Sequence, residues 1–451
     1  MRPELEYDRG RVTVGVVHFG VGGFHRSHQA MFHDRLLSAG EGLDWGICGV
    51  GVMGPDREMR DALLAQDCEY TLVLKHPDGR YVPQVIGSIV EYRFAPDDGE
   101  ATVERMADPQ VRIVSLTVTE GGYTPLEGDP MAFALIAEAL VRRRARDVPP
   151  FTVMSCDNVE ANGEAARAAL VAVAQLRGGD LAEWIAREVA FPSSMVDRIT
   201  PVTSEDDRAE MHRRFGIEDR CPVVAEPFVQ WVLEDRFPTG RPPYEHVGVQ
   251  LVEDVRPYEL MKMRLLNGSH QALAYLGYLC GHRFVDETMQ DPVLRAFVLR
   301  YMDEVTPTLD PVRGVDLDDY KQTLLSRFGN AHVRDTLARV GAMTSDRIPK
   351  FVLPAVRDNL AAGRPIDAGA LVVASWVRYA RGFDEQGDPI AVVDTLRDEL
   401  MAAAQGSDPR TFLVAAGFGD LGYDERFVAA YETALAALDE HGARASMERL
   451  A

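Results

Sequence analysis

A lysine, an asparagine and a histidine stand close together in the segment 258–270, and their types are those that alcohol oxidation needs. Asn267 follows Lys262 by five residues, and His270 follows it by eight. On an α-helix with about 100° per residue, Lys262, His270 and Asn267 fall near 0°, 80° and 140°, so one broad face presents all three. Glu259 lies at about 60° from Lys262 around the same helix axis, on the same side. Removal of a hydride from a carbinol carbon requires a base for the hydroxyl proton and donors for the developing carbonyl oxygen, which this face would supply.

A lysine amine acts as a base only under special conditions. Burial or a neighbouring positive charge must lower its pKa from about 10.4 towards neutrality, and the nicotinium ring of an oxidised cofactor would supply such a charge. The alternative interpretation is an amphipathic helix on which Lys262 and Arg264 are solvated while Asn267 and His270 make local hydrogen bonds. Gly268 in the helix interior costs about 1 kcal/mol relative to alanine, which indicates a close approach there.

A glycine-rich turn near the N-terminus is the second candidate site. Residues 12–19 predict a strand, and the pattern after the turn predicts a helix that continues to Leu37. Between them Gly20-Val21-Gly22-Gly23-Phe24-His25 occupies the place of a dinucleotide-binding turn, where helix N–H groups face the pyrophosphate. His25 stands where the common pattern has its third glycine, so a tight turn without a ligand is the alternative interpretation.

The ends of the other predicted strands offer further cofactor contacts. A strand over 45–52 precedes a helix over 55–65, and an acid at that strand end would bind the ribose hydroxyls of NAD. Asp56 stands there beside Arg57, so NAD is the predicted cofactor and NADP the alternative. The strand predicted over 111–118 ends at the same edge of the sheet. The residues predicted to contact the cofactor are Gly20, Gly22, Phe24, His25, Arg26, Asp56, Thr119 and Glu120.

The chain is long enough for two domains, since its 451 residues exceed the size of a single core. Alternating strands and helices up to about residue 250, including an extended run over 82–94, predict an α/β domain with a largely parallel sheet. Long helical patterns follow at 258–280, 292–302, 366–380, 390–404 and 425–441. The predicted domains are residues 1–255, which bind the dinucleotide, and residues 256–451, which are mainly helical and bind the substrate.

Charge and cysteine content exclude several classes of protein. Forty-eight basic and 70 acidic residues give a net charge of −22, which disfavours nucleic acid and anionic lipid as partners. Five widely spaced cysteines form no C-x-x-C pair, and only Asp34 accompanies the crowded His25, His28 and His33, so no metal site is predicted. Without a run of about 18 apolar residues, no membrane span is expected and the predicted location is the cytoplasm.

Several short motifs follow one another along the chain. Besides the glycine turn and the Lys262–His270 segment, they are Thr119-Glu120-Gly121-Gly122-Tyr123, Ser155-Cys156-Asp157-Asn158, and the segments 194–201 and 231–235. Together they resemble the polyol-specific long-chain dehydrogenase family over nearly the whole chain. The resemblance implies a Rossmann-like N-terminal domain, a mainly α-helical C-terminal domain, and an NAD-dependent oxidoreductase that interconverts a polyol and a ketose without a metal.

The resemblance also implies roles for individual residues. Lys262 is the general base, Asn158 and Asn267 hold the reacting oxygen as amide donors, and His270 orients the substrate. Glu259 gates proton exchange with water. The residues implied to bind substrate are Asp197, Arg339 and Arg347, although solvated surface arginine is the alternative interpretation for the last two.

The identity of the substrate stays open between branches of the family. Residues 258–262 and the segment around Trp231 are most similar to the branch that interconverts D-mannitol and D-fructose. D-Arabinitol and fructuronate are alternatives, and the carboxylate of fructuronate would need a cation such as Arg339 or Arg347. A nucleotide-binding sensor without catalysis and a metal-dependent alcohol dehydrogenase are the alternatives from other classes. Since members of the family are often monomers, a monomer or weak oligomer is expected.

Overall fold

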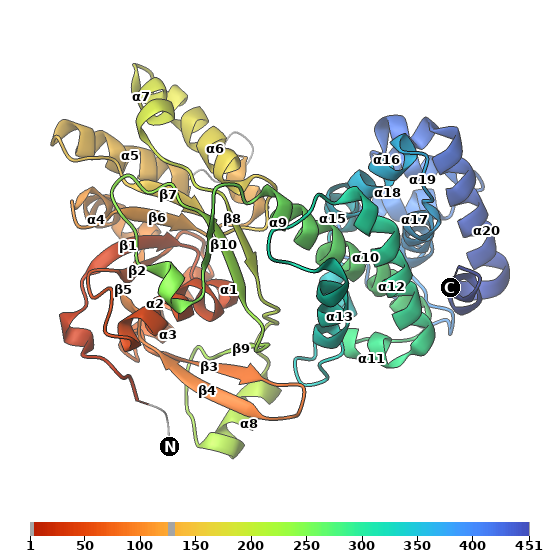
Figure 1. Ribbon diagram of the computed structural model, residues 1–451, viewed down its shortest axis with the longest axis horizontal. Helices are drawn as coiled ribbons and strands as arrows, with labels where there is room; N and C mark the ends of the chain where they lie inside the picture. Colours follow the sequence, from red (N-terminus) through yellow and green to blue (C-terminus); the bar gives the residue numbers. More distant parts are fainter. Residues whose placement is uncertain (1–3, 125–130, 451) are drawn as a thin grey trace. The chain divides into compact units, whose positions relative to one another are not determined.

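The structure is a computed structural model that describes residues 4–124 and 131–450. Its contacts divide the chain into two compact units, Met1–Arg256 and Pro257–Ala451. The first unit, drawn from red to light green in Figure 1, is an α/β unit, and the second is mainly helical. The predicted fold class is therefore confirmed.

Unit 1 is built on a five-stranded sheet whose order is β5 (Ile89–Phe94), β2 (Gly46–Gly51), β1 (Val14–Phe19), β6 (Ile113–Leu116) and β7 (Thr152–Ser155). Every neighbouring pair in it is parallel. The chain starts at the central strand, moves outward to β5, and returns to the other side of β1 for β6 and β7. The order therefore reverses beside β1, and ligands of such sheets bind outside the carboxyl ends of the strands at this place.

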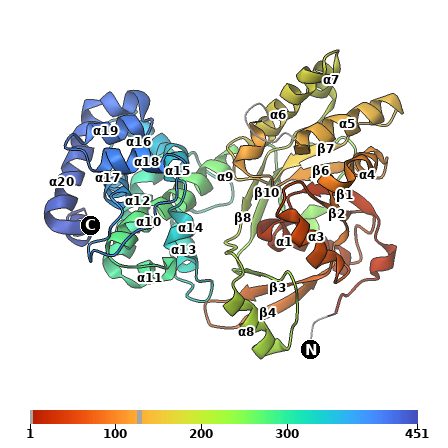
Figure 2. The same ribbon diagram turned by 180° about the vertical axis from the view of Figure 1, so that it is seen from behind.

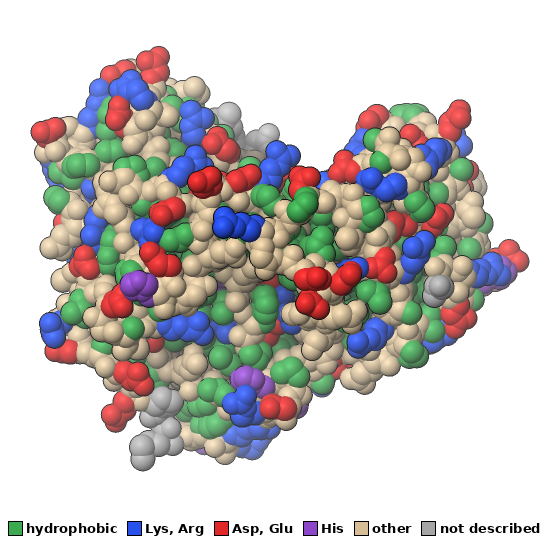
Figure 3. All heavy atoms as spheres, in the orientation of Figure 1, with side chains coloured by type: hydrophobic (Ala, Val, Ile, Leu, Met, Phe, Trp, Pro, Cys, Tyr) green, Lys and Arg blue, Asp and Glu red, His purple; other side chains and the backbone are tan. Residues whose placement is uncertain are grey.

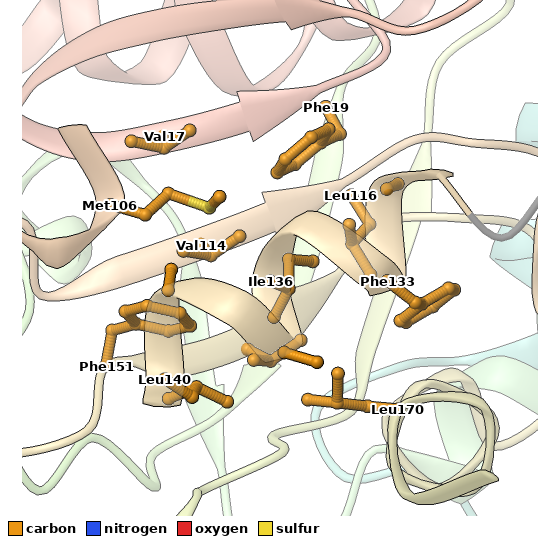
Figure 4. Packing of buried hydrophobic residues seen from close by; sticks show 14 of the residues in the cluster. Val17, Phe19, Met106, Val114, Leu116, Phe133, Ile136, Leu140, Phe151 and Leu170 are labelled. Atoms are coloured by element: carbon orange, nitrogen blue, oxygen red, sulfur yellow. The ribbon is translucent and has the colours of Figure 1, made fainter. Parts of the chain in front are cut away.

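Both faces of the sheet are covered, as its apolar strands require. Helices α4 (Ala95–Ala107), α5 (Met131–Ala145), α6 (Asn162–Arg177) and α7 (Leu181–Glu188) contribute to the core on one face. Figure 4 shows Phe19 and Leu116 of the strands in this core with Phe133 and Ile136 of α5. Strand alternation sends Val17 into this cluster and Val16 to the opposite face.

The opposite face packs against α2 (Gln29–Ser38), α3 (Asp56–Leu64) and two small sheets. One small sheet has the order β11 (Gln250–Val252), β10 (Gln230–Glu234), β8 (Ser194–Asp197). The other has the order β4 (Tyr81–Ile86), β3 (Tyr70–Lys75), β9 (Val223–Ala225), and Figure 2 shows it from the reverse side. Trp231 of β10 is fully buried in this second core.

Two predicted elements of unit 1 are divided in the structure. The helix expected up to Leu37 breaks at His28, which separates α1 (Gly23–Ser27) from α2. The buried His28 ring lies 2.9 Å from the Gln230 carbonyl and stacks on Phe24, so a tertiary contact overrides the helical pattern. The extended run 82–94 splits at residues 87 and 88 because β4 pairs antiparallel with β3, whereas β5 pairs parallel with β2.

Unit 2 surrounds one buried helix, α10 (Gly268–Leu279), all of whose residues are buried. It packs against α12 (Pro292–Val305) and α17 (Asp367–Ala380), and α17 in turn contacts α20 (Glu425–Glu448). The helix predicted over 390–404 is wrong in its first half, since α18 spans only Arg397–Ala404. Asp394 instead accepts hydrogen bonds from Ser345 and from the Leu396 N–H, which hold the preceding segment as a loop.

The surface agrees with the acidic composition only in part. On the face drawn in Figure 3, acidic and basic side chains are intermixed rather than gathered by sign. In the part of the chain that the structure describes, no helix has the length and apolar character needed to cross a bilayer.

Candidate active site

The glycine turn after β1 has one glycine that the fold requires and one that it does not. Gly20 has φ +91°, and a Cβ there would lie 2.0 Å from the Thr117 carbonyl oxygen. Gly22 has an ordinary φ of −79°, and a Cβ on it would meet no heavy atom within 4 Å. Packing within unit 1 therefore explains Gly20 alone. The open space over Gly22, at the start of α1, fits a pyrophosphate group that needs close approach to backbone N–H groups.

Three further residues of this turn have contacts inside unit 1. The His25 ring stacks on His18 with 3.4 Å between centroids, and burial holds the pKa of His25 well below its usual value. The Arg26 guanidinium donates to the Cys221 carbonyl oxygen and lies 5.4 Å from the centre of the Tyr70 ring. Phe24 stacks on His28. These contacts give Phe24, His25 and Arg26 a structural role, and their contact with the cofactor stays a prediction.

The ends of β2 and β6 bring the remaining predicted cofactor residues to the same edge of the sheet. Asp56 Oδ2 accepts hydrogen bonds of 2.9 Å from the N–H groups of Val52 and Met53. Thr119 has φ +64°, a conformation that costs a non-glycine residue about 1–3 kcal/mol. Such strain is typical of ligand sites, where the surrounding structure holds it. Glu120 begins the short helix η2 (Glu120–Tyr123) directly after it.

Asp157 holds this strained edge in place, and sequence reasoning missed its role. Its carboxylate accepts from the N–H groups of Thr119 at 2.9 Å and Val118 at 3.0 Å, and from the Tyr123 hydroxyl at 2.6 Å. Burial raises the pKa of this carboxyl group above its usual value. Asn158 is the next residue and is exposed. Asp157 therefore positions Thr119, a predicted cofactor residue, and directly precedes Asn158.

A second buried network ties the end of β7 to the start of β8, the strand that ends at Asp197. The Asn162 amide donates to the Asp157 carbonyl at 3.0 Å and to the Ser194 carbonyl at 2.7 Å. Ser194 also donates through its hydroxyl to the Ser155 carbonyl at 2.6 Å. Asp197, buried, is the last residue of the strand that Ser194 begins. These bonds fix the start of β8 beside the end of β7, and Asp197 lies at the other end of β8.

The lysine segment of unit 2 is a π-helix rather than an α-helix. Residues Lys262–Asn267 form it between α9 (Arg256–Met261) and α10, and the Gly268 N–H donates to the Met263 carbonyl five residues earlier. A π-turn joins residues five apart by a hydrogen bond, so each turn holds more residues than an α-helical turn. The 140° separation expected for Lys262 and Asn267 is therefore wrong, because the wider turn brings both side chains to nearly the same face.

The predicted catalytic side chains of this segment are buried. Glu259, Lys262, Asn267 and His270 are 7%, 8%, 7% and 9% exposed. A solvated face would leave these side chains open to water, so the alternative of an amphipathic helix with a solvated Lys262 does not describe this segment. Buried polar side chains retained on one helix need partners or a ligand to satisfy them.

His270 lies among charged groups of unit 2 and has an unsatisfied nitrogen. Its Nε2 is buried and has no hydrogen-bond partner within the described residues. Burial lowers the pKa of His270 to about 3; Asp335 opposes this shift, and Arg339 and Arg347 reinforce it. The ring is therefore neutral near pH 7 and can donate to, or accept from, a substrate hydroxyl.

Comparison with known proteins gives matches over both units. The model of the mannitol dehydrogenase Rossmann domain matches residues 14–246, and that of the mannitol dehydrogenase C-terminal domain matches residues 254–439. The chain belongs to the mannitol dehydrogenase family. Mannitol 2-dehydrogenase of Aspergillus fumigatus is 45% identical over 95% of this chain and 91% of its own length. Mannitol dehydrogenase 2 of Saccharomyces cerevisiae is 44% identical over 91% of this chain and 87% of its own length.

Two solved structures match nearly the whole chain. Pseudomonas fluorescens mannitol 2-dehydrogenase, in a ternary complex with NAD and D-mannitol, is 45% identical with a TM-score of 0.91, over 99% of this chain and 96% of the other. A substrate-free D-sorbitol dehydrogenase is 35% identical with a TM-score of 0.88, over 98% and 96% of the two chains. The family resemblance inferred from the motifs is therefore confirmed.

In this member of the family, the histidines near the glycine turn serve the interior of unit 1. The His33 ring lies 2.8 Å from the Trp45 carbonyl and 2.9 Å from the Tyr244 hydroxyl. Burial lowers the pKa of His33 to about 4. Across residues 4–124 and 131–450, no three His, Cys, Asp or Glu side chains are grouped so that they could hold a metal ion.

Gly268, which lies between Asn267 and His270 in the chain, has no room for a side chain. A Cβ on Gly268 would lie 2.4 Å from Tyr301 Oη and 3.2 Å from the Phe351 carbonyl oxygen. We expect Gly268→Ala to displace the helix and to lower kcat for polyol oxidation by about ten- to a hundredfold, because small misplacements of reacting groups have effects of that size. Overpacking should also lower the free energy of unfolding by about 1–3 kcal/mol.

Gly277→Ala is the matched control in the same helix. Its Cβ would lie 2.7 Å from Thr288 Cγ2 and 2.9 Å from Leu337 Cδ1, so it overpacks α10 about as strongly. We expect a similar loss of stability, measured by denaturant unfolding, with little change in kcat. Equal losses of kcat in the two variants would show that Gly268 acts through stability alone.

Proposed function

We propose that the chain interconverts D-mannitol and D-fructose with NAD, using Lys262 as the general base and no metal. Its family membership makes it a polyol dehydrogenase that acts on CH–OH groups. The 45% identity to a protein solved with NAD and D-mannitol supports the choice of cofactor and substrate. The observation that carries the catalytic proposal is the burial of Lys262 and Asn267 in the π-helix and of His270 in the first turn of α10.

The proposed chemistry divides the reaction between this chain and its cofactor. Bound NAD supplies the acceptor for the hydride from carbon 2 of the polyol. Lys262 accepts the proton of the hydroxyl on that carbon at Nζ, and the oxygen becomes the ketone oxygen. The amides of Asn158 and Asn267 donate hydrogen bonds to this oxygen while it carries negative charge. Glu259, three residues before Lys262, passes the proton on to water.

The other proposed residues recognise the remaining hydroxyls of the substrate. His270 in its neutral form bonds to one hydroxyl through Nε2, and Asp197 bonds to another as an acceptor.

Arg339 donates to Asp335 through Nε at 2.6 Å and through a second nitrogen, so its positive charge is already balanced by a buried carboxylate. Arg347 donates to the Val340 carbonyl at 2.7 Å. The pair with Asp335 makes Arg339 a poor partner for the carboxylate of fructuronate, which needs an unbalanced cation.

Initial rates test this proposal. We would measure D-mannitol, D-arabinitol, D-sorbitol and D-mannonate with NAD⁺ by the absorbance of NADH, before and after exhaustive chelation. The expected result is the highest kcat/KM with D-mannitol and no loss on chelation. A higher kcat/KM with D-mannonate or D-arabinitol would overturn the proposed substrate, and loss of activity on chelation would overturn the metal-independent mechanism.

We propose that the enzyme is cytoplasmic and a monomer or weak oligomer. The five cysteines are unpaired, as a reducing compartment requires. Gel filtration of the purified chain at micromolar concentration would test the monomeric state.

A further inference from the structure

One carboxylate at the edge of the central sheet binds two arginines that neighbour the predicted ribose site. We propose that this residue, Asp97, determines the preference of the enzyme for NAD over NADP by neutralising Arg57 and Arg60. The inference rests on the proposed use of NAD and adds a residue that decides which dinucleotide is accepted.

The topology brings these side chains together from two separate segments. Asp97 lies in the first turn of α4, directly after β5, whereas Arg57 and Arg60 lie in the first turns of α3, after β2. Since β2 and β5 are adjacent and parallel, their carboxyl ends meet at one place on the sheet edge. Asp56, the residue predicted to bind ribose, precedes Arg57 there.

Asp97 uses both of its oxygens on the two guanidinium groups. Arg57 donates to Oδ1 at 2.7 Å and to Oδ2 at 2.8 Å, and Arg60 donates to Oδ2 at 2.9 Å. Hydrogen bonds from Arg57 and then Arg60 hold the pKa of Asp97 below its usual value. Both guanidinium groups also lie against the Phe94 ring, at 4.7 Å and 5.5 Å from its centre. Each guanidinium group is therefore held by a carboxylate and an aromatic ring, although the Arg57 side chain stays half exposed.

The local charge disfavours the additional phosphate of NADP. Arg60 also pairs with Asp61 at 2.7 Å, so two positive charges stand against the three negative charges of Asp56, Asp61 and Asp97. The resulting charge of −1 opposes a 2′-phosphate, which adds about two negative charges near neutral pH. Recognition of such a phosphate needs a guanidinium whose fork is open, and the fork of Arg57 is occupied by Asp97.

Replacement of this carboxylate tests the inference without a turnover assay. We would titrate NAD⁺ and NADP⁺ into the full chain and the Asp97→Asn variant by calorimetry, without polyol. We expect the Kd of NADP⁺ to fall about two- to fivefold, as one released and partly exposed charge pair allows, while that of NAD⁺ changes by less than that. The gain should shrink at high salt, because the cluster is partly exposed. Asp97→Glu, which keeps the charge, should retain the preference for NAD⁺.

Asp180→Asn is the matched control. Asp180 pairs with Arg144 through two bonds of 2.9 Å and 2.7 Å, at the start of α7, so its loss changes the net charge equally. Provided that NAD⁺ binds normally, two results would overturn the inference. One is an unchanged NADP⁺ affinity in Asp97→Asn, and the other is an equal gain in NADP⁺ affinity in Asp180→Asn. Failure of the unaltered chain to bind NAD⁺ would instead overturn the proposed function, and this inference with it.

Discussion

Lys262→Ala should lower kcat for mannitol oxidation by about a thousandfold and leave the Kd of NAD⁺ within about twofold of its original value. General base catalysis contributes about 10²–10⁴-fold, and the removed amine is the only proposed acceptor for the hydroxyl proton. Lys262 is buried in the π-helix, so we would first verify folding by circular dichroism and thermal unfolding. Steady-state kinetics and a calorimetric titration of NAD⁺ then separate catalysis from cofactor binding.

Lys262→Arg distinguishes a base from a positive charge. Arginine keeps the charge and the donors, but its guanidinium does not release a proton in a protein. If Lys262 serves as the base, the two variants should lose kcat to a similar extent. An arginine variant close to the original activity would show that the role of Lys262 is to supply positive charge.

Gly22→Ala should weaken NAD⁺ binding by about ten- to a hundredfold without changing the stability of the protein. The added methyl group meets no protein atom within 4 Å and the backbone has an ordinary φ, so we expect no change in the free energy of unfolding. A pyrophosphate close to the N–H groups of the turn would collide with it, and a hundredfold loss corresponds to about 2.7 kcal/mol. Calorimetry with NAD⁺ and a thermal unfolding curve provide the two measurements.

Two other glycines serve as references for this variant. Gly99→Ala in α4 places its Cβ 3.7 Å from Leu135 Cδ2, an ordinary contact, and should leave NAD⁺ affinity unchanged. Gly20→Ala would clash with the Thr117 carbonyl oxygen at 2.0 Å and should destabilise unit 1 itself. Normal NAD⁺ affinity in Gly22→Ala would contradict the assignment of this turn to the pyrophosphate.

The parts that sequence predicted well depend on local patterns. The apolar run of β1, the glycines after it and the alternation of strands and helices predicted a parallel sheet with a dinucleotide turn. The Lys262–His270 segment was predicted to be helical in the same way, although its first part is a π-helix rather than an α-helix. These signals lie within a few residues of one another, so no tertiary information was needed.

The parts that sequence missed depend on contacts between distant segments. Asp157 holds Thr119 across 38 residues, and Asp97 binds Arg57 across 40 residues, so no local spacing identifies either role. The break at His28 follows from a contact with Gln230, 202 residues away. The π-helix at Lys262 has no local signature, although Gly268, which packs against Tyr301, hinted at a close approach.

Chemical rescue of Lys262→Ala by small primary amines tests the proposed proton acceptor most directly. We would measure mannitol oxidation with saturating NAD⁺ at increasing concentrations of amines of similar size and different basicity. The predicted result is a rate that rises with the concentration of the uncharged amine and more steeply for the more basic amines. A rate that does not respond to any amine, in a variant that folds and binds NAD⁺ normally, would contradict the role of Lys262 as the base.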